Sequence, residues 1–495
     1  MRKIILMIML ITLMLSGCQN ENRAIKSLDD LKTARIGAWL DSGYELKARE
    51  AFPNAKFVHL DFLSDLVQNL KQNKIDAFVI GKSYVENLKF EGVEVNYLPK
   101  SLGELPLGYI FPKNERGQKI CSQMNEFIAS IKQNGEFEAL ETKWLHSDES
   151  KRTFTKSNIT GANGKLIICT DAQSPPFEYL REGQVVGFEA EIIDKFCAAY
   201  DYDYEIKVEK FLTMLGDVTT GKVDVGMNAL EIFPEREENL QFSNPIHFEQ
   251  AVAVINSESN GVLNVSDRIK SSLIDESRWK MILDGALTTL TITFFSIIFG
   301  TLLGLAIYLL YREKTSANRI IDVIYRTLQG VPIMVLLLFF YYVVFGSVNL
   351  PASAVAVVVF SIVLSISVFT MIKSGAESIS GGQMEAALSL GFSERRAFIK
   401  FILPQVIRNN FANYQLQLNA ILLETAIVGY ISVQDLTRTA DLIRARTYDA
   451  FIPIITIALV YLLLSKLLFL ITDVISHKIE PKNRKKTEIL REVKL

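Results

Sequence analysis

Five long apolar segments fill the second half of the chain, and they constrain its fold more than any other feature. We place them near residues 282–311, 320–346, 351–372, 411–431 and 451–476. A helix needs about 20 apolar residues to cross a hydrocarbon core of about 30 Å, and its backbone polar groups are satisfied within the segment. The sequence therefore predicts an all-α domain of five membrane spans within residues 278–480.

The charges that flank these segments predict their orientation. Residues 275–495 hold 22 Lys and Arg against 16 Asp and Glu, whereas residues 1–274 hold 31 against 39. Loops rich in Lys and Arg tend to stay in the cytoplasm, which places 311–319, 383–405 and the basic tail 481–495 inside. The last loop fits this rule less well, because it carries three arginines. They are Arg438, Arg444 and Arg446.

The N-terminus has the features of an export signal. Arg2 and Lys3 precede the apolar run 4–15, which is too short for a comfortable span. Leu15-Ser16-Gly17-Cys18 resembles a bacterial lipobox, which implies cleavage before Cys18 and acylation of its thiol. The alternative is a plain secretory signal with an incidental cysteine. Either reading predicts that residues 19–277 lie outside the bacterial cell (inner) membrane and that the C-terminus lies in the cytoplasm.

Several other classes of protein find no support in the sequence. The net charge of −2 gives no reason to expect nucleic acid binding, and the four histidines are too scattered for a zinc site. Cys121, Cys169 and Cys197 fit no metal motif and are expected to be buried free thiols, although one disulfide among them is possible. The segment 216–222 fits the first part of a phosphate loop, but Val223 stands where Ser or Thr is needed. We expect Gly221 to end a helix there instead.

A charged, helix-prone loop at Gln383–Gln405 lies between two apolar segments. Its simplest explanation is that it docks onto a cytoplasmic partner; the alternative is an ordinary amphipathic helix that ends at Gly391. The loop resembles the EAA loop of ABC importer permeases, in which two short helices fit a groove on a separate ATPase. The matching residues are Glu385, Ala386, Ala387, Gly391, Leu403 and Pro404. The resemblance implies an ABC ATPase partner that uses the ATP, and no cofactor in this chain.

Residues 279–480 also resemble permeases for polar amino acids of the His/Gln type. Gly285–Leu290 is similar to the opening motif of that family, and Gln329–Pro332 to its "RGTP" segment with Gln in place of Arg. The family implies a second permease domain, expected here to form a homodimer. Glu424 is an ionisable group at membrane depth, so it is a candidate for the translocation pathway. The alternative places Glu424 at the interfacial end of its span.

The exported half resembles a type II substrate-binding protein with its parts in swapped order. Residues 165–256 resemble lobe 1, through Pro175–Tyr179 and Phe242–Pro245 among other motifs, and their short strands alternate with helices as in a parallel sheet. Residues 25–147 resemble lobe 2 and the C-terminal part. A linker at 148–164 joins them, and a second at 257–277 leads to the spans. We infer a circular permutation; the rival interpretation is two truncated receptors left from a tandem.

The family resemblance places the ligand-binding residues. Arg236 matches the arginine that pairs with a ligand carboxylate, and Phe211 matches the wall around the ligand side chain. A surface ion pair and a helix staple are their structural alternatives. Backbone N–H groups at the start of a lobe 2 helix add to the carboxylate site. The residues there are Asp41, Ser42, Gly43 and Tyr44. Further lobe 1 candidates are Asp171, Glu178, Asn228 and Glu231.

The chain departs from the family where the ligand would be identified. The ammonium-binding Asp of lobe 2 aligns with Gly81, and the hydroxyl residue ahead of the arginine aligns with Glu231. An ammonium without a partner in a closed cleft is costly. We therefore hypothesise that Glu231, with Asp171 or Asp41, takes over this role for a cationic or modified amine substrate.

These observations predict an α/β two-lobe type II periplasmic-binding-protein fold, with swapped lobe order, followed by an all-α five-helix permease domain. The predicted function is the substrate-binding and permease subunit of an ATP-driven ABC importer for amino acids or related small amines. The alternative is a ligand-gated channel or sensor that uses the same receptor fold. No nucleophile–base pair or metal cluster supports an enzyme.

Overall fold

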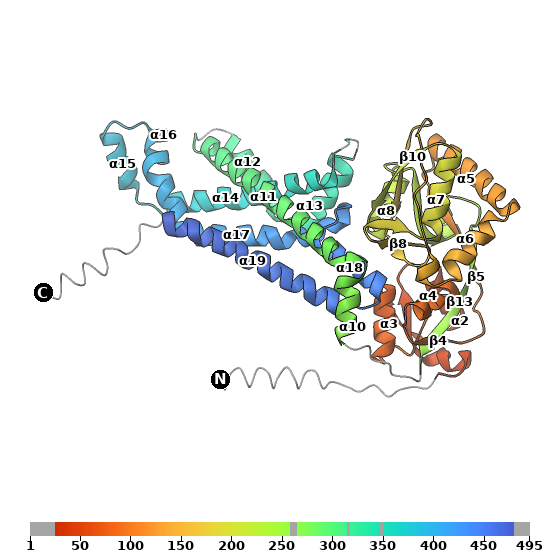
Figure 1. Cartoon of the computed structure of the whole chain (residues 1–495). Coiled ribbons are helices and arrows are strands. Elements are labelled where there is room, and N and C mark those ends of the chain that lie inside the picture. The colour runs from red at the N-terminus through yellow and green to blue at the C-terminus, as the bar shows by residue number, and fades with distance from the viewer. Residues whose placement is uncertain (1–24, 258–264, 314–316, 347, 349, 480–495) are drawn as a thin grey trace, which may run out of the picture. The chain divides into compact units, whose positions relative to one another are not determined.

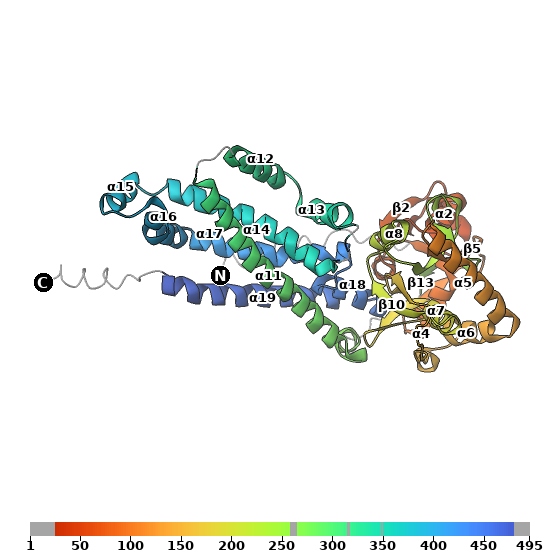
Figure 2. The same ribbon diagram turned by 90° about the horizontal axis from the view of Figure 1, so that it is seen from above.

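The computed structural model describes residues 25–479 except 258–264, 314–316, 347 and 349 (Figures 1 and 2). The predicted lipobox at Cys18 and the basic tail 481–495 lie outside the described residues. The chain divides into two compact units. Unit 1 is the chain up to Arg278 together with Leu442–Pro453, and unit 2 is Trp279–Asp441 with the chain from Ile454.

Unit 1 is built on one sheet whose strands follow the order β10-β6-β11-β5-β13-β3-β1-β2. The strands of lobe 2 are β1 (Arg35–Trp39), β2 (Lys56–Leu60) and β3 (Ala77–Gly81), and those of lobe 1 are β6 (Lys165–Thr170), β10 (Asp203–Val208) and β11 (Val225–Glu231). Within each lobe these strands run parallel. Parallel strands are usually covered on both faces, and every residue of β3 is buried.

Two strands join the lobes. β5 (Glu104–Phe111) pairs antiparallel with β11 of lobe 1, and β13 (His247–Asn256) pairs antiparallel with β3 of lobe 2 and with β5. The chain therefore crosses between the lobes twice, at adjacent strands that form a hinge. This arrangement confirms the predicted two-lobe α/β fold, with the strands of lobe 2 first in the sequence.

Helices complete both lobes. Those of lobe 2 are α2 (Gly43–Ala51), α3 (Leu63–Lys71) and α4 (Lys82–Phe90), and those of lobe 1 are α7 (Phe188–Ala199) and α8 (Phe211–Thr219). After α8, Gly221 has φ +73°, the left-handed conformation in which glycine ends a helix. Helices α5 (Glu115–Gln133) and α6 (Glu136–Leu145) follow the first crossing. Lys143 of α6 forms an ion pair with Glu191 of α7 at 2.6 Å, which fixes α6 against lobe 1.

The segment 148–164 packs closely against the lobes. Ser157 donates its backbone N–H and hydroxyl to Asp194 of α7, and Thr160 makes the same two contacts with Asp201. The side chain of Arg152 is buried and donates to Oδ1 of Asn87 on α4 at 2.5 Å. This predicted linker is therefore tied to elements of both lobes.

Unit 2 is helical. Among the described residues, three helices are long and apolar enough to cross a membrane: α11 (Arg278–Tyr311), α14 (Ala352–Glu377) and α19 (Phe451–Ile479). The second predicted segment is a bent pair, α12 (Ala317–Gln329) and α13 (Ile333–Phe339), with an angle of 107° between its halves. The fourth is also part of a bent pair, in which the chain through α17 (Leu403–Glu424) meets α18 (Leu436–Thr447) at 54°. The described helices give five spans only if each bent pair counts as one.

The span predicted over 320–346 is broken into two helices, which the sequence did not predict. The break lies at Gly330–Pro332, and Pro332 stands immediately before α13. Proline lacks an N–H and its ring clashes with the preceding turn, so a helix does not continue through it. The same residues carry the resemblance to the "RGTP" segment.

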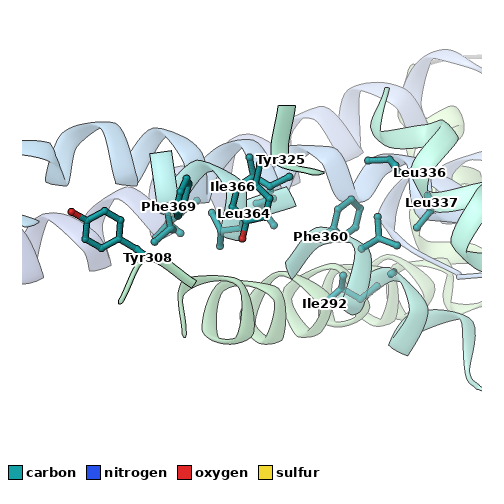
Figure 3. Close-up of a cluster of buried hydrophobic side chains, with 14 of the residues drawn as sticks. Ile292, Tyr308, Tyr325, Leu336, Leu337, Phe360, Leu364, Ile366 and Phe369 are labelled. Carbon is teal, nitrogen blue, oxygen red and sulfur yellow. The ribbon is translucent and has the colours of Figure 1, made fainter. Parts of the chain in front are cut away.

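The core of unit 2 gathers around α14 (Figure 3). The ring of Phe369 on α14 lies 5.0 Å from that of Tyr325 on α12 and 6.1 Å from that of Tyr308 on α11, both edge-on. Gly300 and Gly304 let α11 approach α14 closely, since a Cβ on Gly304 would lie 2.6 Å from the carbonyl oxygen of Ser365. Small residues four apart are typical of packed membrane helices.

Polar side chains link the helices of unit 2. Gln415 of α17 donates to Oγ1 of Thr472 on α19 at 2.9 Å, and Ser465 of α19 donates to Asn419 of α17 at 2.6 Å. Hydrogen bonds of this kind hold neighbouring helices together where water is absent.

Candidate functional site

The predicted EAA loop forms the short helix α15 (Gly381–Ser389) and the turn α16 (Glu394–Ala397), which continues through the π-helix Phe398–Ile402 into α17 (Figure 1). Gly391 lies between them with φ +85°, and nothing lies within 4 Å of the position that a Cβ would take. Its role is therefore conformational, because a side chain there would strain the turn without meeting a neighbour.

The hairpin has both exposed and buried side chains. Glu385 and Ala386 are exposed, and Leu390 is 77% exposed, whereas Ala387 and Ala397 are buried. An exposed leucine and an exposed carboxylate are both available to a partner. Ala387 instead packs inside the hairpin, which gives it a structural role.

Two contacts brace the hairpin. The ring of Phe392 lies 5.1 Å from that of Phe401, edge-on, and Gln405 donates to Oε1 of Gln383 at 2.6 Å. Leu403 and Pro404 form the first turn of α17. The predicted coupling residues therefore lie on one connected piece of chain.

Glu424 is the last residue of α17, where the α-helix gives way to the 3₁₀ turn Thr425–Ile431. Its Oε2 is enclosed and has no hydrogen-bond partner within the described part of the chain. A carboxylate oxygen left without a partner is costly, so the position is consistent with the predicted pathway role, which remains a prediction.

In unit 1 the start of α2 faces lobe 1. Ser42 caps the helix by accepting the N–H of Glu45 at 3.2 Å, and Asp41 before it has φ +58°. A Cβ on Gly43 would lie 3.2 Å from the side chain of Glu231 on β11. Tyr44 is buried, and its hydroxyl has no hydrogen-bond partner among the described residues.

Arg236 joins the two lobes. Its Nη1 donates to Oε2 of Glu231 at 2.8 Å, and its Nη2 donates to the backbone carbonyl of Asp41 at 2.6 Å. The guanidinium also lies 4.4 Å from the ring centre of Phe233 and 5.8 Å from that of Phe211. The structure thus brings predicted residues of both lobes together around Arg236.

Asp171 is engaged within lobe 1. Its backbone N–H donates to Oδ1 of Asn228 at 3.0 Å, and its Oδ1 accepts the N–H of Gln173 at 3.0 Å. Asp41 is exposed and contacts Arg236 through its backbone. Glu231 is paired with Arg236 and Asp171 is hydrogen-bonded within lobe 1, whereas the side chain of Asp41 is exposed.

The sequence did not predict a role for Glu249 in the site. A Cβ on Gly81 would lie 2.3 Å from Cγ of Glu249, so Glu249 of β13 occupies the space beside the glycine where the family carries Asp. Its Oε1 accepts the N–H of Ser83 at 3.0 Å, and its Oε2 lies 3.3 Å from Nε2 of His247. The only signal was the pairing of β3 with β13, which puts Ala251 opposite Gly81.

A second unpredicted cluster involves the loop arginines. Arg446 is 6% exposed, and its Nη atoms lie 2.6 Å from Oε1 of Glu91, 2.7 Å from Oε1 of Glu276 and 3.5 Å from Oε1 of Glu149. Its guanidinium also lies 5.0 Å from the ring centre of Tyr179 on lobe 1. These contacts lie within unit 1, to which Leu442–Pro453 belongs.

Other expectations concern cysteine and metal chemistry. Cys121, Cys169 and Cys197 are buried and unpaired, as expected. Among the residues that the structure describes, no group of three or more His, Cys, Asp or Glu side chains could hold a metal ion.

Comparisons with known proteins find both a solute-binding family and permeases. The model of the bacterial extracellular solute-binding proteins, family 3, matches residues 166–425, which is more than half of the chain. The L-cystine transport system permease protein TcyB of Bacillus subtilis is 28% identical over 221 residues, covering 44% of this chain and 94% of that protein. The arginine ABC transporter permease protein ArtQ of Haemophilus influenzae is 29% identical over 188 residues, covering 36% and 83%. A crystal structure of an amino acid ABC transporter with histidines has 30% sequence identity and a TM-score of 0.39, covering 44% of this chain and 99% of its own.

Proposed function

The chain belongs to the bacterial extracellular solute-binding proteins, family 3, and we propose that its two units act as receptor and permease of one ABC importer for amino acids or related small amines. The observation that carries this proposal is the presence, in one chain, of a hinged two-lobe receptor and a helical unit similar to amino acid permeases. Ligand closes the lobes by motion at the crossing strands, and the permease then passes it across the membrane.

The energy for transport comes from a separate ATPase that binds the hairpin α15–α16. The exposed Glu385 and Leu390 support this assignment. A second permease domain, expected to be a second copy of this chain, completes the pathway. Residues 19–277 lie outside the membrane, and the hairpin and C-terminus lie in the cytoplasm.

The arginine cluster of unit 1 supports this topology. Arg444 pairs with Asp65 of lobe 2 at 2.6 Å, and Arg446 pairs with Glu91. Because these arginines bind carboxylates of the exported half, the loop that carries them lies on the same side as the receptor. Their positive charge therefore does not argue for a cytoplasmic loop.

The coupling role is tested by purifying the tagged full chain from its own membranes and measuring ATPase turnover of the complex with and without ligand. We expect an ATPase to co-purify and its turnover to rise with ligand. Glu385→Arg is expected to abolish both, whereas Glu313→Arg, an equal charge change at an exposed turn outside the hairpin, leaves them unchanged. Equal loss in both variants, or no effect of Glu385→Arg, would contradict the assignment.

A further inference from the structure

The junction between the lobes holds more buried carboxylates than cations. Glu178 on β8 (Glu178–Arg181) is 0% exposed, and among the described residues no Lys, Arg or His forms an ion pair with its carboxylate. Burial, with Glu189 and Asp171 nearby, raises the pKa of Glu178 well above its usual range. Burial also raises the pKa of Glu189 to about 7. Two buried carboxyl groups without a paired cation resist full ionisation, and a bound cation would relieve this.

Arg236, which would bind a ligand carboxylate, is already occupied. Glu231 and the carbonyl of Asp41 accept both of its Nη groups, and Phe233 stacks against it. A ligand carboxylate would have to displace Glu231, which carries the same charge and is held on the same chain. An intramolecular competitor acts at an effective concentration of roughly millimolar, so a carboxylate gains little there.

Glu249 adds a second carboxylate at the position beside Gly81. Among the described residues, His247 is the basic side chain that contacts Glu249. His247 also contacts a second carboxylate, since its Nδ1 lies 2.9 Å from Oε1 of Glu141 while its Nε2 faces Glu249. Even with His247 protonated, these three groups carry a net charge of −1.

Buried aromatic rings lie at the same junction between the lobes. Tyr84 lies 6.2 Å from Tyr44, 5.9 Å from Trp39 and 5.2 Å from Phe177, measured between ring centres. Phe177 precedes Glu178 in the chain, and its ring also lies 5.8 Å from that of His247, which contacts Glu249. Burial raises the pKa of Tyr84 well above its usual range. Rings beside carboxylates are the chemistry that proteins use to bind ammonium and guanidinium groups.

We propose that the cleft takes an organic cation, recognised by its ammonium or guanidinium group through Glu178, Glu249 and the tyrosines Tyr44 and Tyr84, and that a ligand carboxylate is not required. This inference rests on the proposed receptor function and names its substrate class. It assigns the ammonium-binding role to Glu178 and Glu249 in place of Glu231 with Asp171 or Asp41.

Titration calorimetry of the full chain in lipid nanodiscs tests the inference with agmatine, which is arginine without its carboxylate, and with arginine, glutamine and glutamate. We expect agmatine to bind at least as tightly as arginine, and glutamine and glutamate to bind at least about tenfold more weakly, which corresponds to about 1.4 kcal/mol. Arginine binding at least about tenfold more tightly than agmatine would overturn the proposal, as would tightest binding of glutamine or glutamate.

Variants identify the carboxylates. Glu249→Gln and Glu178→Gln are each expected to weaken agmatine binding at least about tenfold, whereas Glu104→Gln, at an exposed position on the neighbouring hinge strand, has no effect. Unchanged affinity in the first two variants would overturn the roles of these residues. If a variant fails to fold, the comparison of agmatine with arginine on the unaltered chain still decides.

Absence of binding by both cations would also overturn the inference. In that case the ATPase would still co-purify without ligand, and Glu385→Arg would still abolish this co-purification. Failure of the substrate class is thereby distinguished from failure of the importer assignment.

Discussion

Three carboxylates converge on the buried guanidinium of Arg446, and this single side chain holds several parts of unit 1 together. Glu91 follows the last residue of α4 in lobe 2, Glu149 lies in the segment between the lobes, and Glu276 lies in the linker after lobe 1. Burial opposes the charge, but the three carboxylates keep the pKa of Arg446 above its usual range. Tyr179 of lobe 1 donates to Glu149, which extends the network to both lobes.

Arg446→Ala should destabilise unit 1 by about 3–5 kcal/mol, because it leaves buried carboxylates without a counter-charge. Hydrogen–deuterium exchange of the full chain should show faster exchange at residues 84–91 and 146–152. Arg49→Ala removes an arginine from an exposed ion pair with Glu45 and should change neither segment. If both segments exchange as slowly in Arg446→Ala as in the unaltered chain, Arg446 does not stabilise the contacts between these parts of unit 1.

His247 gives unit 1 a pH dependence. Burial opposes its protonation, but hydrogen bonds to Glu141 and Glu249 raise its pKa to about 9. A raised folded-state pKa adds stability that is fully present below the unfolded value of about 6.5 and is lost as the pH rises through about 9. The contribution of His247 is roughly 3 kcal/mol.

Urea unfolding followed by the fluorescence of Trp39 and Trp144 measures this effect. The free energy of unfolding should fall between pH 6.5 and pH 9, and His247→Gln should remove most of that fall. A fall of the same size in the variant would assign the pH dependence to other groups.

Among the elements, the packing of α11 on α14 depends on Gly300 and Gly304. A Cβ on Gly300 would lie 2.8 Å from Cβ of Leu364, and one on Gly304 would lie 2.8 Å from Cβ of Val368. These distances leave no space for a side chain, so the two helices approach along their backbones.

Gly304→Leu should therefore destabilise unit 2 by about 1–3 kcal/mol through overpacking. Gly381→Leu is a matched control, because nothing lies within 4 Å of the Cβ position there. Thermal unfolding of the detergent-solubilised full chain compares the two. Equal melting temperatures in both variants would contradict close contact between α11 and α14.

The elements were largely predictable from the sequence, because hydrophobic periodicity and glycine positions are local. The helix that ends before Gly221 and the turn at Gly391 in the loop 383–405 lie where expected. The break before Pro332 was missed because the apolar run continues on both sides of it. Glu249 was missed because its place beside Gly81 depends on a strand pairing between residues distant in the sequence.

At the scale of the whole molecule, one chain carries parts that act together in transport. Fusion raises the local concentration of receptor to roughly the millimolar range, so docking becomes intramolecular. The segment Leu442–Pro453 groups with unit 1 although the chain on both sides of it belongs to unit 2. No periodicity could reveal this, because it depends on ion pairs such as Arg444 with Asp65.

The central claim is that this chain is the receptor and permease of an importer that a separate ATPase drives. The most direct test reconstitutes the full chain with its co-purified ATPase in proteoliposomes that contain ATP, and follows uptake of radiolabelled ligand. We predict that ligand accumulates above its external concentration, and that enclosed ADP or the Glu385→Arg variant abolishes this accumulation. Ligand-evoked ion flux without ATP, or uptake that is independent of ATP, would contradict the claim.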